Sequence, residues 1–209
     1  MKAKQIQSLL ILAFTAIFIG YLNVWLPGPG AGLSFLGIEM GEWFKFLGLG
    51  ARRDLFYLPP ITLSLMLAIW TVTWSRQGWQ AWLMRLIAVL ISLLAFPAIE
   101  DIIGSVREQY TLRVALIALV VLVAVLSGFW HPTGKRKRLP WILLALLGLI
   151  GAFLPTWIYM IVRPFAGQII GVPIGIGVGV ILNGGGHLLI TGISLFQIAT
   201  INRSVFAGS

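Results

Sequence analysis

Residues 167–187 read GQIIGVPIGIGVGVILNGGGH and form the most unusual stretch of the chain. Every fourth residue is small or polar, and the residues between are almost all apolar; the recurring residues are Gly167, Gly171, Gly175, Gly179, Asn183 and His187. On one α-helix they would form a ridge that lets another backbone approach closely inside a membrane, where helices associate through packing and hydrogen bonds. The spacing therefore predicts a helix-packing surface made of the four glycines and Asn183.

A second interpretation of the same stretch remains open. Between Gly171 and Leu182 large apolar residues alternate with glycine or proline, which is the period of a strand. Extended backbone survives inside a membrane only where protein or water satisfies its polar groups, as in a re-entrant loop or a filter. The Gly-rich segment 167–186 is then either part of a packing helix or a segment lining a path.

The length of the apolar run requires a break. Residues 165–201 would extend about 55 Å as one helix, against a hydrocarbon core of about 30 Å. The triplet 184–186 is glycine, so we expect the break there. Either 165–183 dips into the membrane before 187–201 crosses it, or an interfacial piece precedes a crossing from about 176 that is broken in its middle.

Composition defines the class of the whole chain. Hydrophobic residues make up 59% of the 209 residues and charged residues only 10%, which is too little polar surface for a soluble globule. The chain has no cysteine, which excludes disulfides, thiol catalysis and cysteine-ligated metals. We therefore expect an all-α, polytopic helical membrane protein with one membrane domain, 1–209.

Hydropathy and loop signals predict about six spans and one interfacial segment. The spans are 6–26, 55–75, 83–99, 112–130, 139–162 and 176–201. Segment 33–50 combines an apolar helical face with acidic residues, and we expect it to lie in the interface as an amphipathic helix.

Basic residues assign an orientation. With the N-terminus in the cytoplasm, nine of the 15 basic residues lie in inner segments, including the run Lys135, Arg136, Lys137 and Arg138. We expect a plasma membrane protein, typical of a prokaryotic inner membrane, in which this run contacts anionic lipid headgroups. Arg85 and Arg113 fall just inside span ends, where long side chains would extend to the headgroups. Nucleic acid is not an expected partner, because the basic residues behind the net charge of +9 are explained by their role in setting the orientation in the membrane.

Few residues are candidates for chemistry. Arg52, Arg53, Glu100 and Asp101 form a predicted outer charged cluster, whose exposed pairs would contribute about 0 to 1 kcal/mol each. His187 is a possible ligand or hydrogen-bond site in an apolar region. Hydrogen bonding to a neighbouring helix is its ordinary role, and haem or chlorophyll ligation is the functional alternative. No motif implies a cofactor, and no HExxH, Walker A or GxSxG pattern occurs.

Two functions follow from these observations. The first is a non-enzymatic membrane subunit that packs through its glycine ridge into a larger assembly, with itself or with other membrane subunits. The alternative is a channel or transporter permease in which the Gly-rich segment lines the path.

Overall fold

The computed structural model describes residues 3–47, 50–74, 77–103 and 107–206. The described chain is all-α apart from one short hairpin, which confirms the predicted class. The α-helices are α1 (Ala3–Tyr21), α2 (Gly37–Trp43), α3 (Leu58–Val72), α4 (Trp79–Ser92), α5 (Ile99–Ile103), α6 (Thr111–Ser127), α7 (Leu139–Ile170) and α8 (Val178–Phe206). The strands β1 (Val24–Leu26) and β2 (Phe35–Leu36) pair antiparallel. Six 3-10 helices are η1 (Ala31–Leu33), η2 (Phe44–Leu47), η3 (Gly50–Tyr57), η4 (Leu93–Ala95), η5 (Arg107–Tyr110) and η6 (Gly134–Arg138).

Within the described residues, five helical segments are long and apolar enough to cross a membrane, as a helical membrane protein requires. They are Lys4–Tyr21, Arg52–Val72, Glu108–Ser127, Arg136–Ile170 and Val178–Asn202. A further apolar helix, Trp79–Ala95, is shorter than these five. It corresponds to the predicted span 83–99.

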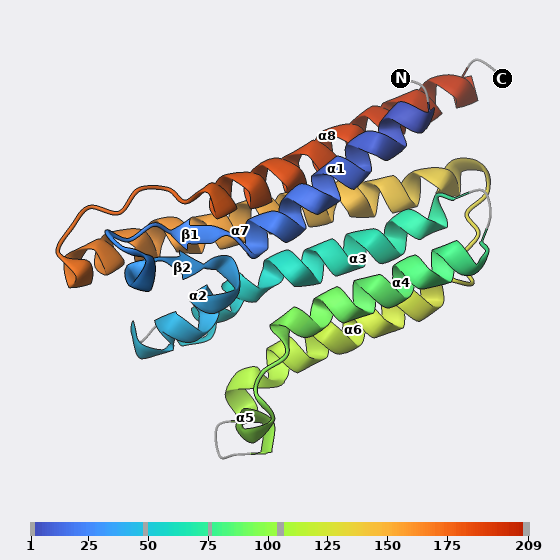
Figure 1. The fold of residues 1–209 in the computed structure, drawn as a ribbon. Helices are drawn as coiled ribbons and strands as arrows, with labels where there is room; N and C mark the ends of the chain where they lie inside the picture. The colour runs from blue at the N-terminus through green and yellow to red at the C-terminus, as the bar shows by residue number, and fades with distance from the viewer. Residues whose placement is uncertain (1–2, 48–49, 75–76, 104–106, 207–209) are drawn as a thin grey trace.

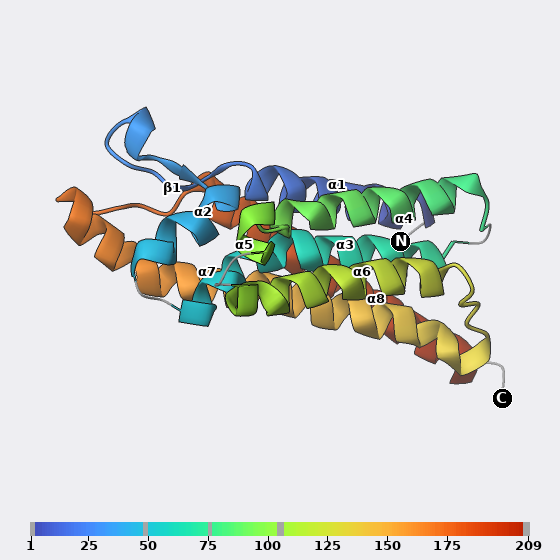
Figure 2. The same ribbon diagram turned by 90° about the horizontal axis from the view of Figure 1, so that it is seen from below.

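The helices form a bundle around α3, which is buried along almost its whole length (Figure 1). α1, α8 and α7 lie on one side of it, and α4 and α6 lie on the other (Figures 1 and 2). The buried residues of α4 recur at helical spacing, and three of them are small: Ala81, Ala88 and Ser92. These small side chains let α4 pack closely on α3.

The two ends of the bundle differ in structure and charge. α1 begins and α8 ends at the same end, which also carries η6; we call it the basic end (Figure 1). The hairpin, α2, η3 and α5 gather at the opposite end, which we call the cap end (Figures 1 and 2). Both names rest on the described residues, with the run 135–138 at one end and Glu42 and Asp54 at the other.

The predicted interfacial segment 33–50 folds onto the bundle in three pieces. Only Gly37–Trp43 is α-helical, preceded by β2 and followed by η2. Met40 and Phe44 are completely buried in a cluster with Trp25 of β1 and Tyr159 of α7. The apolar face of this segment therefore packs against protein; residues 48–49 lie outside the described chain.

Two predicted helix boundaries are wrong. α7 continues past residue 162 to Ile170 and contains Pro155 and Pro164 in its interior. α8 runs unbroken through Gly184, Gly185 and Gly186, where we expected a break. In an apolar surrounding no water competes for the backbone groups, so glycine and proline interrupt a helix less readily than they do in solution. The α7–α8 break lies at residues 171–177 instead.

Candidate functional site

The predicted ridge does not form one helix, because its members lie in three different structures. Gly167 is in the last turns of α7, and Gly171 ends that helix in the left-handed region with φ 78°. Gly175 lies in the irregular connector 171–177, where its carbonyl accepts a hydrogen bond from the Tyr159 hydroxyl at 2.9 Å. Gly179 and Asn183 are in α8. A left-handed residue followed by Pro173 ends the helix, and the single-ridge prediction is therefore wrong.

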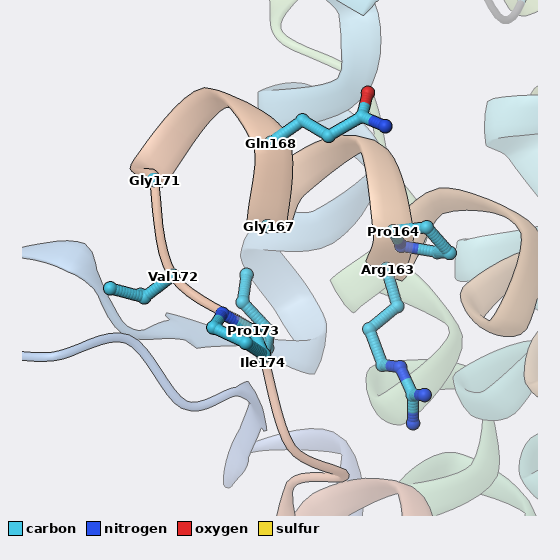
Figure 3. A pocket seen from close by; sticks show the side chains of 8 residues that line it. All are labelled: Arg163, Pro164, Gly167, Gln168, Gly171, Val172, Pro173 and Ile174. Carbon is cyan, nitrogen blue, oxygen red and sulfur yellow. The ribbon is translucent and has the colours of Figure 1, made fainter.

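The end of α7 and the connector enclose an open pocket at the cap end (Figure 3). Its volume is about 470 Å³, and it is lined by Arg163, Pro164, Gly167, Gln168, Gly171, Val172, Pro173 and Ile174. A Cβ on Gly167 would lie 3.1 Å from the Val172 carbonyl, so glycine lets the connector fold back closely here. Gln168 points away from the connector residues Pro173 and Ile174 (Figure 3). The pocket offers one cation, Arg163, and otherwise mainly apolar walls.

One face of α8 packs against α1 through backbone contacts. A Cβ on Gly179 would lie 2.5 Å from Trp25 Cδ1 and 2.6 Å from the Gly20 carbonyl. A Cβ on Gly186 would lie 2.7 Å from Ile17 Cγ1. Both glycines therefore bring helices together, as small residues do in membranes, but the helices belong to the same chain.

A second face of α8 carries a row of buried polar residues that we call the polar seam: Asn183, His187, Thr191 and Ser194. Their spacing of four, four and three residues places them on one side of the helix. Asn183 Nδ2 donates to the Gly151 carbonyl of α7 at 3.3 Å. His187 Nε2 lies 2.9 Å from Thr62 Oγ1 of α3. The polar seam thus joins α8 to two neighbouring helices.

Both ring nitrogens of His187 have partners in the protein. Nδ1 lies 2.9 Å from the Asn183 carbonyl, which can only accept, so the ring donates from Nδ1. Nε2 lies against the Thr62 hydroxyl, which also has the Leu58 carbonyl at 2.8 Å as an acceptor. The ring is completely buried, and Gly151 packs directly on its Nε2 edge. This geometry supports the hydrogen-bond role, and it offers no free nitrogen for the haem or chlorophyll option.

The third face of α8 is open. A Cβ on Gly185 or Gly192 would have no atom within 4 Å. The surrounding side chains are large, apolar and exposed: Ile181, Leu188, Leu189, Leu195 and Phe196. The two glycines are seven positions apart, so both lie on nearly the same line along the helix. We call this surface the open α8 face.

The charged cluster at the cap end is organised around Arg113 of α6, which is only 1% exposed. Its guanidinium donates to Glu42 Oε1 at 3.2 Å and forms an ion pair with Asp54 Oδ1 at 3.3 Å. It lies 3.8 Å from the ring centre of Tyr57 and 4.8 Å from that of Tyr110. Arg113 therefore fastens α2 and η3 of the cap to α6 of the bundle.

The predicted outer cluster is placed differently. Arg53 is buried over the Tyr110 ring and donates to Gln109 Oε1 at 3.4 Å. Arg52 and Glu100 are both exposed, and among the described side chains they form no ion pair with each other. The Asp101 side chain lies outside the described side chains. Among the described side chains, Arg113 instead forms ion pairs with the half-exposed Glu42 and with the buried Asp54.

Arg85 and Arg113 do not extend to the headgroups as expected. Arg85 is 2% exposed and donates through Nε to Ser127 Oγ of α6 at 3.0 Å. Its Nη2 donates to the Ser127 carbonyl at the end of α6, where the helix dipole favours a cation. Both arginines lie on the buried sides of their helices, α4 and α6.

The basic run forms η6 at the basic end. Arg136 and Lys137 are exposed, as residues that contact headgroups must be. Arg138 is partly buried, and the side chain of Lys135 lies outside the described side chains.

Sequence reasoning missed several contributors to these sites, among them Glu42, Asp54, Tyr57, Thr62, Ser127 and Thr191. The only available signal was polarity within or beside an apolar segment, which does not identify a partner in a distant segment. Comparison with known proteins assigns no family, since no family model, no curated protein and no solved structure matches the chain.

Proposed function

We propose that the chain is a non-enzymatic integral membrane subunit that binds a transmembrane helix of another subunit, or of a second copy, through the open α8 face. One observation supports this most. α8 uses small residues to approach α1 on one face and polar residues to hold α7 and α3 on another, and a third face carries two glycines with no neighbour.

Glycine on a lipid-facing surface has no packing role of its own. In a helix interior it costs roughly 1 kcal/mol relative to alanine. Small residues let a second backbone come close, and the exposed apolar residues around Gly185 and Gly192 would supply van der Waals contacts. A spacing of seven residues suits a partner that crosses α8 at a small angle.

Two leucine substitutions on α8 test this function. Gly192→Leu and Gly185→Leu should lower the size of the complex on a native gel while leaving the monomer folded, because space surrounds both positions. Gly179→Leu is the matched control, since its side chain would collide with Trp25 and should reduce folded protein instead. An unchanged complex in both open-face variants would contradict the proposal.

A second candidate function is a channel or permease, favoured by buried oxygens without a partner. Asn183 Oδ1, Ser194 Oγ and Ser64 Oγ are buried and accept or donate no hydrogen bond within the described chain. Polar groups inside a membrane often mark a substrate path. The path would then follow the polar seam, while the Gly-rich connector 171–177 lies at its cap end.

Cysteine accessibility separates the two candidates. The chain has no cysteine, so Ser194→Cys or Asn183→Cys introduces a single thiol. A water-soluble thiol reagent should leave both unmodified in membranes if the seam only holds helices together, and modification would favour transport. A cysteine at exposed Lys137 is the positive control.

We also propose a plasma membrane location, of the prokaryotic inner-membrane type, with the basic end in the cytoplasm. Lys and Arg near span ends favour the cytoplasmic side, and η6 carries four of them in a row. A reporter that is active only in the cytoplasm should therefore be active when it is fused after residue 206. Activity of a reporter that requires export would reverse the assignment.

A further inference from the structure

A pocket at the basic end lies between α3, α7 and α8. Its volume is about 390 Å³, and it is lined by Val72, Thr73, Trp74, Pro132, Lys137, Pro140, Trp141 and Ile201. Two tryptophans and a lysine around one pocket are typical of the boundary between hydrocarbon and headgroups. The pocket therefore lies where a lipid headgroup would be found.

The pocket contains donors that the protein does not use. Trp74 Nε1 is buried and has no acceptor within the described chain. Lys137 is exposed at the pocket rim and carries a positive charge, and the Nε of its neighbour Arg138 is also buried without an acceptor. A buried indole N–H without an acceptor is costly, so these groups call for acceptor oxygens with negative charge.

An apolar groove lies between α3, α6 and α7. Its volume is about 550 Å³, and it is lined by Leu65, Ile69, Leu119, Val123, Leu126, Ser127, Trp130, Leu143, Leu146, Leu147 and Ile150. α3 and α7 line both the groove and the pocket, and the loop after α6 contributes Trp130 to one and Pro132 to the other. The apolar lining of the groove suits an acyl chain, and the elements that it shares with the pocket suit a lipid whose headgroup occupies the pocket.

We infer that the protein binds one anionic phospholipid at this place, with the phosphate at Trp74 and Lys137 and an acyl chain along the α3–α6–α7 groove. The phosphate oxygens accept from the indole N–H and neutralise the lysine. Charge complementarity selects the occupant, because the pocket has two cationic residues of η6 beside it and no acidic lining residue. This site is independent of the open α8 face, which lies on another side of α8.

The test is native mass spectrometry of the purified full chain with dioleoyl-phosphatidylglycerol or dioleoyl-phosphatidylcholine added to the detergent. The wild type should retain one phosphatidylglycerol in preference to phosphatidylcholine. Trp74→Phe removes the N–H and keeps an aromatic ring, and Lys137→Gln removes the charge. Each should weaken phosphatidylglycerol retention by about tenfold, the effect of one hydrogen bond to a charged group.

Arg136→Gln is the matched control, because Arg136 lies in the same basic run but does not line the pocket. It should leave retention unchanged; equal losses in Arg136→Gln and Lys137→Gln would mean diffuse attraction and overturn the site. Leu146→Trp fills the groove and should weaken retention without changing charge. Competition by inorganic phosphate as effective as that by the lipid would also overturn the proposal, since the acyl chain would then contribute nothing.

Discussion

Replacing Arg113 by glutamine removes the cation at the centre of the cap-end cluster. Asp54 is 5% exposed and would keep a buried charge without its counterion, which costs roughly 3 to 5 kcal/mol. The Glu42 pair adds little, because that side chain is 50% exposed and water replaces its partner. Two cation–π contacts with Tyr57 and Tyr110 contribute roughly another 1 kcal/mol or more. The expected loss is therefore about 4 to 6 kcal/mol.

Unfolding in mixed detergent–SDS micelles measures this loss, with helix content as the readout. Asp54→Asn should cost less than Arg113→Gln, because Arg113 keeps Glu42 as a counterion. The double variant should lose less unfolding free energy than the sum of the two single losses, since neither buried charge then remains. Additive losses, or a loss below about 1 kcal/mol in Arg113→Gln, would refute the reasoning that the buried pair holds the cap.

Three further substitutions test the contacts between helices. Gly151→Ala should destabilise the protein by about 1 to 3 kcal/mol in the same unfolding assay, because its methyl group would overlap the His187 ring; wild-type stability would mean that the helices separate easily there. Thr62→Val keeps the shape but removes the hydroxyl, and it should cost only about 0.6 to 1.7 kcal/mol. Arg85→Gln should cost roughly 1.5 to 3 kcal/mol through its lost bonds to Ser127. Because Arg85 also donates to the Gln77 side chain in the loop between α3 and α4, faster proteolysis of that loop should accompany the loss. No change in that loop would contradict an anchoring role for Arg85.

The membrane class could be predicted from the sequence because it depends on composition and segment length alone. Five of the six predicted spans, 6–26, 55–75, 112–130, 139–162 and 176–201, overlap helices that the structure shows to be long and apolar enough to cross. The glycine-rich stretch was singled out from the sequence as unusual. Its structure was not predictable from spacing, since the left-handed Gly171 and the bond from Tyr159 to Gly175 depend on the tertiary fold.

The inward rotation of Arg85 and Arg113 could not be predicted either. α4 and α6 are apolar on nearly every side, so the sequence does not indicate which side faces α3. A long arginine near a helix end can reach either headgroups or buried partners. The partners that keep these arginines buried are Glu42 and Asp54 for Arg113 and Ser127 for Arg85. These partners lie in distant segments of the sequence and reach the arginines only in the folded chain.

The open α8 face also required the structure. All the glycines of α8 look alike in sequence, yet Gly179 and Gly186 contact α1 while Gly185 and Gly192 contact nothing. Only the packing of the other helices determines which of them remain available to a partner. The hypothesis of a glycine-mediated assembly is therefore kept, but the glycines proposed to contact the partner are now Gly185 and Gly192.

Photo-crosslinking along α8 in native membranes tests the proposed interface most directly. A benzophenone amino acid is placed singly at Ile181, Leu188 and Leu195 of the open α8 face, with Leu122 on the exposed side of α6 as control. The account predicts one discrete adduct of constant mass from all three α8 positions and none from Leu122. Adducts from all four positions alike, or from none, would contradict an interface on the open α8 face.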